Sequence, residues 1–133
     1  MINVSCGIII RDNKILLAQR SELMVHPLKW EFPGGKQQNK ETLENSLQRE
    51  LKEELNIEID ILQPLKSVEY QYPDINIKLH PFICSYISGE INLLEHKQIA
   101  WVRPSKLLSY DLAGADIIVA KNLSDDLLYF GVS

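Results

Sequence analysis

The chain has 133 residues, 45% of them hydrophobic, and this length suits one domain, residues 1–133, built around a single sizeable core. Its formal net charge of -4 excludes binding to duplex nucleic acid through a generally basic surface. Charged side chains interrupt every apolar stretch before it reaches the roughly 18 residues of a membrane span. The first residues also lack the basic and apolar segments of a secretion signal, so we expect a cytoplasmic protein without membrane contact.

Two strands are predicted near the N-terminus. Residues 4–10 are apolar and β-branched, and residues 14–19 follow them across the turn-forming pair Asp12-Asn13. Residues 21–40 are rich in proline, glycine and polar side chains, which predicts a long and mostly irregular loop. A loop of this length in so small a domain is often functional.

A helix is predicted from Thr42 to Leu55, because the segment lacks Gly and Pro and its leucines recur at 43, 47, 51 and 55. Thr42 is a typical N-cap residue, and Glu44 lies in the first turn, where the helix dipole favours negative charge. Asn56 tolerates the left-handed conformation that commonly ends a helix.

The second half of the chain alternates strand-like segments with turns and then predicts another helix. The expected strands are residues 57–62, 66–72, 75–87 and 99–102. The second helix is expected to begin at Asp111 or Gly114 and to end at Leu123. These elements favour an α/β fold, a mixed sheet with helices over both faces. Cys6 and Cys84 lie in strand-like apolar runs, without metal-ligand spacing, and are expected to be buried free thiols.

Carboxylates cluster on the first predicted helix. Glu50 and Glu54 share the azimuth of the packing face, while Glu53 lies about a quarter-turn to one side. The helix alone allows two interpretations. In one, the face is simply solvated and Arg49 binds Glu53; in the other, Glu50, Glu53 and Glu54 hold a divalent cation such as Mg²⁺.

The stretch from Gly35 to Ile57 resembles the signature of a known family. It reads G-x5-E-x7-R-E-L-x-E-E-x-N-I, and eight of its nine fixed positions match the Nudix box. The departure is Asn56, where the family has Gly, and Asn is the mildest replacement in a left-handed position. The match favours the metal interpretation of the carboxylates over the solvated face.

The resemblance continues beyond the box to the MutT-like branch, over about residues 7–121. Residues 30–36 resemble the lead-in to the box, residues 69–74 resemble the next hairpin, and Glu95 resembles an acidic loop residue ahead of a strand. The family fold is an α/β/α sandwich around a mixed sheet, with the box helix on one side and the C-terminal helix on the other. The implied reaction is attack of water on phosphorus, dependent on Mg²⁺ or on Mn²⁺, which releases a nucleoside monophosphate and pyrophosphate.

The resemblance also implies roles for individual residues in the metal site. Glu50 and Glu54 correspond to metal ligands, Glu53 to a further ligand, and the carbonyl of Gly34 or Gly35 completes the shell. Arg49 is expected to orient these carboxylates, and Glu41 either does the same or stabilises the start of the helix. The general base is left open among Glu50, Glu53 and Glu95, because members of the family differ.

Nucleotide binding is assigned to residues outside the helix. Arg20 matches an arginine that contacts the nucleotide in MutT, and His26 is a candidate contact to base or phosphate. Phe32 either flanks the base or packs in the core. The backbone from Glu31 through Pro33 to Gly34 is expected to bind the edge of the base, whereas His80 is expected to be a satisfied or exposed histidine. His96 is expected to have no role in the site, with a contact to phosphate as the alternative.

Base specificity is open at this stage. MutT reads oxidised guanine with an Asn where this chain has Ala115, but the adjacent Asp116 can still accept or donate a hydrogen bond. The pattern L-A-x-A-D-I, residues 112–117, also resembles a branch that hydrolyses cytidine triphosphates, including methylated cytosine nucleotides. Sanitation of the nucleotide pool, with 8-oxo-dGTP as leading substrate, is therefore weighed against hydrolysis of CTP or 5-methyl-dCTP.

Other functions are also considered. A Nudix hydrolase of another nucleoside diphosphate derivative, such as a sugar nucleotide, a dinucleoside polyphosphate or an RNA 5′ end, is less favoured because the chain is short and lacks a basic strip. A non-catalytic nucleotide sensor is disfavoured because every box carboxylate is present. The sequence leaves a monomer and a homodimer both open.

Overall fold

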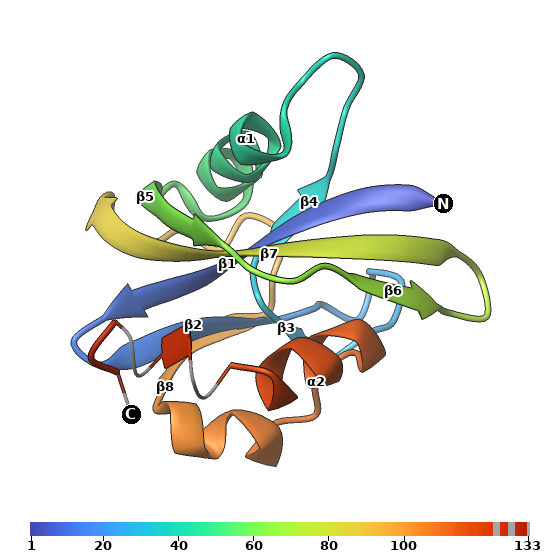
Figure 1. Cartoon of the computed structure of the whole chain (residues 1–133). Helices are drawn as coiled ribbons and strands as arrows, with labels where there is room; N and C mark the ends of the chain where they lie inside the picture. The colour runs from blue at the N-terminus through green and yellow to red at the C-terminus, as the bar shows by residue number, and fades with distance from the viewer. Residues whose placement is uncertain (124–125, 128–129, 133) are drawn as a thin grey trace.

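The computed structural model describes residues 1–123, 126–127 and 130–132 (Figure 1). Over these residues a mixed sheet has eight strands: β1 (Ile2–Arg11), β2 (Lys14–Gln19), β3 (Trp30–Glu31), β4 (Gly34–Lys36), β5 (Glu58–Pro64), β6 (Val68–Gln71), β7 (Asn76–Ser88) and β8 (Gln98–Val102). Its main order is β3-β2-β1-β7-β5, and β4, β6 and β8 pair with β1, β7 and β2, respectively. The central pair, β1 and β7, is parallel, whereas the other pairings are antiparallel.

The first predicted hairpin is confirmed. Strands β1 and β2 pair with Ile10 opposite Ile15, and the turn between them is Asp12-Asn13. Both turn residues adopt positive φ angles, 50° and 62°, the conformation that a two-residue hairpin of this twist requires.

Helix α1 (Leu43–Leu55) has the boundaries and caps that its sequence predicts. Thr42 has extended backbone, and its hydroxyl accepts the Asn45 N–H at 3.0 Å. Asn56 ends the helix with φ 58°, and its backbone N–H donates to the carbonyls of Leu51 and Lys52. The caps and the leucine stripe therefore fix which helix face lies on the sheet.

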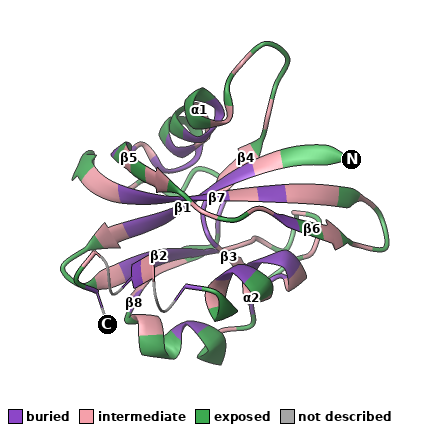
Figure 2. Cartoon of the chain, viewed as in Figure 1, coloured by how far each residue is buried: buried purple, intermediate pink, exposed green. Residues whose placement is uncertain are grey.

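Two cores form on opposite faces of the sheet. Leu47, Leu51 and Leu55 of α1 pack on Ile9 and Leu16, all fully buried. On the other face, α2 (Gly114–Lys121) and the 3₁₀ helix η1 (Pro104–Ser109) cover a second cluster that includes Ile8, Leu17, Leu107 and Val119. Figure 1 shows α1 on one side of the strands and α2 with η1 on the other, and Figure 2 shows the buried stripes between them. The predicted α/β/α sandwich is confirmed, and Cys6 and Cys84 are buried and free as expected.

The irregular loop predicted over residues 21–40 is partly wrong. It contains β3 and β4, which are too short to show a period in sequence and form because β2 and β1 offer them paired edges. Helix η1 was not predicted, and α2 ends two residues before the expected Leu123. None of the helices in the described part of the chain is long and apolar enough to cross a membrane.

Candidate active site

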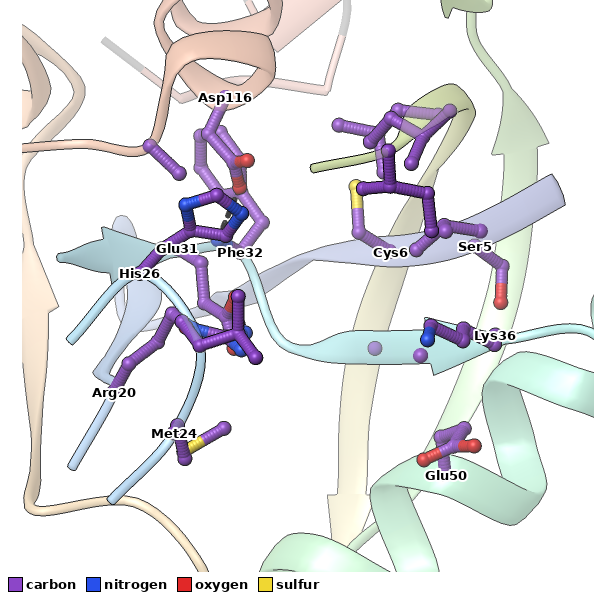
Figure 3. Close-up of a pocket in the computed structure, with 18 of the residues that line it drawn as sticks. Ser5, Cys6, Arg20, Met24, His26, Glu31, Phe32, Lys36, Glu50 and Asp116 are labelled. Carbon is purple, nitrogen blue, oxygen red and sulfur yellow. Dashed lines mark hydrogen bonds and ion pairs between the residues drawn. The ribbon is translucent and has the colours of Figure 1, made fainter. Parts of the chain in front are cut away.

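A pocket of about 680 Å³ opens between the N-terminal end of α2, the loop before β3 and the face of α1 (Figure 3). Figure 3 shows Asp116 at one end of this pocket and Glu50, on α1, at the other. Most of the residues predicted to form the site line it: Arg20, His26, Glu31, Phe32, Gly34, Gly35, Glu50, Glu54 and Asp116. Among the described residues, Arg49, Glu53, Glu95 and Pro33 lie outside its lining.

The three box carboxylates differ in exposure, as the helical azimuths predict. Glu54 is buried, and the Glu50 side chain is only 14% exposed. Glu53 is 58% exposed and points to Arg49 rather than into the pocket. The fold therefore brings Glu50 and Glu54 to the pocket and leaves Glu53 at its outer side.

Arg49 links these carboxylates to the loop before the helix. Its Nε and Nη2 donate to both oxygens of Glu41, at 3.0 and 2.7 Å, in a bidentate pair. Its Nη1 donates to Glu50 at 3.0 Å and to Glu53 at 3.1 Å. The bonds from Arg49, followed by the Gln38 backbone N–H, lower the pKa of Glu41 to about 2. Glu41 thus anchors the guanidinium that holds Glu50. This favours a role for Glu41 in orienting the carboxylates over one in stabilising the start of the helix.

Glu54 is an acidic side chain buried on the pocket side of α1. Its Oε2 is buried and has no hydrogen-bond partner among the described residues. Burial first, and then the negative charges of Glu31 and Glu50, raise its pKa well above the usual range for a carboxyl group. A bound cation would stabilise the charged carboxylate against both effects, so these residues fit a divalent metal ion.

The backbone of Gly35 makes room for this arrangement. A Cβ at Gly35 would lie 2.3 Å from the carboxyl carbon of Glu50, so only Gly lets β4 approach the carboxylate this closely. In residues 1–123, 126–127 and 130–132, no three acidic, His or Cys side chains are already gathered as a complete metal-binding set. Glu53 would therefore have to leave Arg49 to join Glu50 and Glu54 around one ion.

Glu31 occupies the middle of the pocket and is held by two basic side chains. Arg20 Nη1 donates to its Oε1 at 2.9 Å, and His96 Nε2 lies 2.8 Å from its Oε2. The prediction for Arg20 was a nucleotide contact, and the structure adds this ion pair with Glu31. The sequence favours no site role for His96, with a phosphate contact as the alternative, whereas its ring bonds Glu31 and its Nδ1 is buried without a partner among the described residues.

Asp116 lies in the first turn of α2 and is 6% exposed. Its Oδ2 accepts the Phe32 backbone N–H at 2.9 Å, so this backbone donor is already used and the Phe32 ring packs in the core. The Pro33 carbonyl likewise accepts the Gly7 N–H at 2.8 Å. Burial, followed by the charge of Glu31, raises the pKa of Asp116 to about 8, which favours its protonated form at neutral pH.

The lining of the pocket includes contacts that sequence reasoning missed. His26 Nε2 lies 3.2 Å from Asp74 Oδ1, and its ring packs on Tyr72 with centroids 4.6 Å apart. The Tyr72 hydroxyl accepts the Ala115 N–H at 2.9 Å, which ties the β6–β7 turn to α2. Because the partners are more than 40 residues apart, no local sequence signal marks these contacts. The remaining acidic candidate, Glu95, is exposed on the loop next to Leu94, whose N–H donates to the Glu54 carbonyl.

The α/β/α fold and the arginine-linked carboxylates beside a ligand-sized pocket define the class as a Nudix hydrolase. The chain belongs to this family, because the NUDIX domain model matches residues 1–123. The resemblance to its MutT-like branch is confirmed by relatives and solved structures alike. Nudix hydrolases generally use a divalent metal ion.

Three similar proteins illustrate the match. The CTP pyrophosphohydrolase of Escherichia coli K12 is 39% identical over 88% of this chain and 87% of its own length. The 8-oxo-dGTP diphosphatase of Buchnera aphidicola subsp. Schizaphis graminum is 38% identical over 75% of both chains. The solution structure of the E. coli ORF135 protein superposes with a TM-score of 0.80 at 37% identity, covering 91% of this chain and 86% of that one.

Proposed function

We propose that this Nudix hydrolase cleaves nucleoside triphosphates to a nucleoside monophosphate and pyrophosphate, and so removes unwanted nucleotides from the pool. The observation that carries this proposal is one continuous pocket, lined by Glu54, with Glu50 of α1 at one end and the buried Asp116 at the other. A nucleotide matches these two ends, because its phosphates need a cation and its base needs hydrogen bonds. Relatives named as a pyrophosphohydrolase and as a diphosphatase of nucleoside triphosphates support it. The cytoplasmic location stays a prediction, and so does a single domain over residues 1–133.

The metal is proposed to be Mg²⁺, with Mn²⁺ able to replace it, held by Glu50 and Glu54. Glu53 is proposed as a further ligand and the carbonyl of Gly34 or Gly35 as the last one from the protein. When bound, the ion supplies acidification of water and neutralisation of the phosphates.

The chain's own residues then orient the reaction. Arg49, fixed by its bidentate pair with Glu41, holds Glu50 in one rotamer, which spares the site reorganisation when substrate binds. In the reaction water forms the new bond to phosphorus, the phosphoanhydride bond breaks, and a carboxylate takes the proton of the water. Glu50, Glu53 and Glu95 all remain candidates for that carboxylate.

Two base classes are proposed as substrates. The first is oxidised guanine, as in 8-oxo-dGTP, which is the substrate named for one relative. The second is cytosine, and the state of Asp116 favours it. A protonated Asp116 donates one hydrogen bond while a Glu31 oxygen accepts one, and cytosine offers the complementary pair in its ring N3 and its N4 amino group.

A product assay tests the proposal. The purified protein is incubated with Mg²⁺ and ordinary, 8-oxo-guanine and 5-methylcytosine nucleoside triphosphates, and pyrophosphate and orthophosphate are detected separately. We expect pyrophosphate release concentrated on one base class and abolished in Glu54→Gln. If every triphosphate is inert while Mg²⁺ still binds, triphosphates are the wrong substrate, and sugar nucleotides and dinucleoside polyphosphates form the next panel.

The variant Asp116→Ala tests the base contact within the same panel. It should change the ranking among bases more than it lowers the rate on the preferred one, because a buried hydrogen-bonding group discriminates between bases. An equal loss on every nucleotide would contradict a contact between Asp116 and the base.

A further inference from the structure

Glu31 is an acidic side chain that acts on residues at both ends of the pocket. It lines the pocket, and its negative charge acts on Glu54 at the cation end and on Asp116 at the base end. Since these neighbours are also carboxyl groups, Glu31 needs hydrogen-bond donors to offset the repulsion among them and to hold it in one orientation. The structure supplies two donors, one for each of its oxygens.

His96 supplies one donor from a loop far along the chain. Its Nε2 lies 2.8 Å from Glu31 Oε2, and its side chain is 0% exposed. Arg20 takes the other oxygen, Oε1, at 2.9 Å. A carboxylate held on both oxygens from two separate elements has little freedom to rotate.

The loop that carries His96, residues 89–97, is itself fixed by the backbone. Leu94 N–H donates to the Glu54 carbonyl at 3.3 Å, and Lys97 N–H donates to the Gln19 carbonyl at 2.9 Å. The first bond attaches the loop to the last turn of α1, and the second attaches it to the end of β2. The position of the imidazole is therefore set by rigid elements on both sides of it.

The surroundings of the ring also select its tautomer. Nδ1 is buried, and it has no hydrogen-bond partner in the part of the chain that the structure describes. A hydrogen on Nδ1 would thus be a buried donor without an acceptor, whereas a hydrogen on Nε2 points to a carboxylate. The ring is therefore arranged to donate to Glu31.

We propose that His96 is a positioning residue for base discrimination: it fixes the Glu31 carboxylate so that Glu31 and Asp116 present a rigid pair of hydrogen-bonding groups to the base. The inference rests on the proposed function, because it assigns His96 a role within that nucleotide site. His96 touches neither the substrate nor the metal in this role, and it acts only through Glu31.

Two space-filling variants separate positioning from packing. His96→Gln keeps a side-chain N–H donor, whereas His96→Leu fills the same space without one. His80→Ala is the matched control, because His80 bonds Asn3 on the sheet and does not line the pocket. If His96→Leu does not fold, His96→Asn replaces it, since its side chain is polar but too short to replace the bond to Glu31 Oε2.

The readout is the ratio of kcat/KM for CTP to that for 8-oxo-dGTP. We expect His96→Leu to change this ratio about tenfold, in the same direction as Glu31→Gln does. The double variant, His96→Leu with Glu31→Gln, should have the same ratio as Glu31→Gln alone, because groups that act as one unit have non-additive effects. His96→Gln should return the ratio to near wild type, and His80→Ala should leave it unchanged. An equal loss on both nucleotides, or additive effects in the double variant, would overturn the proposal.

A binding experiment distinguishes failure of the proposed function from failure of this inference. If the wild-type protein hydrolyses neither nucleotide, the same variants are compared by calorimetric affinity for CMP and 8-oxo-dGMP, which requires no turnover. A shifted affinity ratio in His96→Leu supports the positioning role even then. An unchanged ratio, or no binding of either monophosphate by the wild type, overturns it.

Discussion

Gly35 and Glu50 lie so close together that a methyl group on Gly35 would stand 2.3 Å from the Glu50 carboxyl carbon. Glu50 is also bonded to Arg49, and Arg49 is held by Glu41, so a carboxylate that moves away from β4 has to disturb these bonds. The glycine is therefore required by the placement of an acidic side chain. Position 34 requires glycine for a different reason, since a Cβ there would lie 1.9 Å from the Ser5 backbone oxygen.

These two glycines give a matched pair of variants. Gly35→Ala should displace Glu50 and lower the rate of hydrolysis at least tenfold, with a small change in melting temperature, because a side chain can shift where a strand cannot. Gly34→Ala should mainly destabilise the fold, because β4 would have to leave β1. Thermal melts and initial rates on both variants check this, and a Gly35→Ala protein with wild-type activity would contradict the constraint on Glu50.

Glu54→Gln separates the cation site from the fold. Hydrolysis should fall by several orders of magnitude, because the amide is a poor replacement for a carboxylate ligand. The metal-free variant should be at least as stable as the wild type, because a neutral side chain removes the burial and repulsion that raise the pKa of Glu54.

Calorimetric titration with Mg²⁺ and thermal melts check both parts of this prediction. In the wild type, Mg²⁺ should raise the melting temperature, and its affinity should increase with pH, because the ion displaces a proton from Glu54. The variant should lose this stabilisation. Activity within tenfold of wild type would remove Glu54 from the metal site.

Sequence reasoning succeeded where the relevant pattern is local. The leucine period, Thr42 and Asn56 define α1, and the helical azimuth alone separates the buried Glu54 from the exposed Glu53. It was less successful where structure depends on distant partners. Strands β3 and β4 exist because β2 and β1 pair with them, and a strand of two or three residues has no period to detect.

The middle of the pocket shows the same division. Arg20 and Glu31 were assigned individually to the nucleotide site, but their ion pair joins residues 11 positions apart, and the contact of Glu31 with His96 joins residues 65 apart. His96 follows Glu95 in an exposed loop, where nothing in the sequence marks it as buried. Only the fold, which packs that loop on the ends of α1 and β2, places its ring beside Glu31.

Asn56, the one departure from the Nudix box, gives a prediction about stability. Its φ of 58° is tolerated by Asn, and its Nδ2 donates to the Glu90 carbonyl at 3.3 Å. Asn56→Ala should lower the free energy of unfolding by about 1 kcal/mol, whereas Asn56→Gly should change it by less than about 0.5 kcal/mol, because Gly relieves the backbone but loses the side-chain bond. Urea denaturation of the three proteins measures both values, and an Ala variant as stable as wild type would contradict backbone strain at this position.

Asp116→Asn should alter the dependence of stability on pH. The folded protein keeps the Asp116 proton up to a pKa of about 8, whereas the unfolded chain releases it near pH 4. Between these values the unfolded state binds fewer protons, so the free energy of unfolding of the wild type falls as pH rises from about 4 to 8. Asn is neutral and its oxygen can still accept the Phe32 N–H, so the variant should lack this loss and be more stable at pH 8 by on the order of a few kcal/mol.

The check is the difference in free energy of unfolding between Asp116→Asn and wild type, measured by urea denaturation at several pH values in metal-free buffer. Taking the difference cancels other titrating groups, Glu54 included, as long as they respond equally in both proteins. The difference should grow in favour of the variant as pH rises through the window and then level off above pH 8. A difference independent of pH would mean that Asp116 is ionised in the folded protein at neutral pH, and it would then present two acceptors to the base instead of a donor.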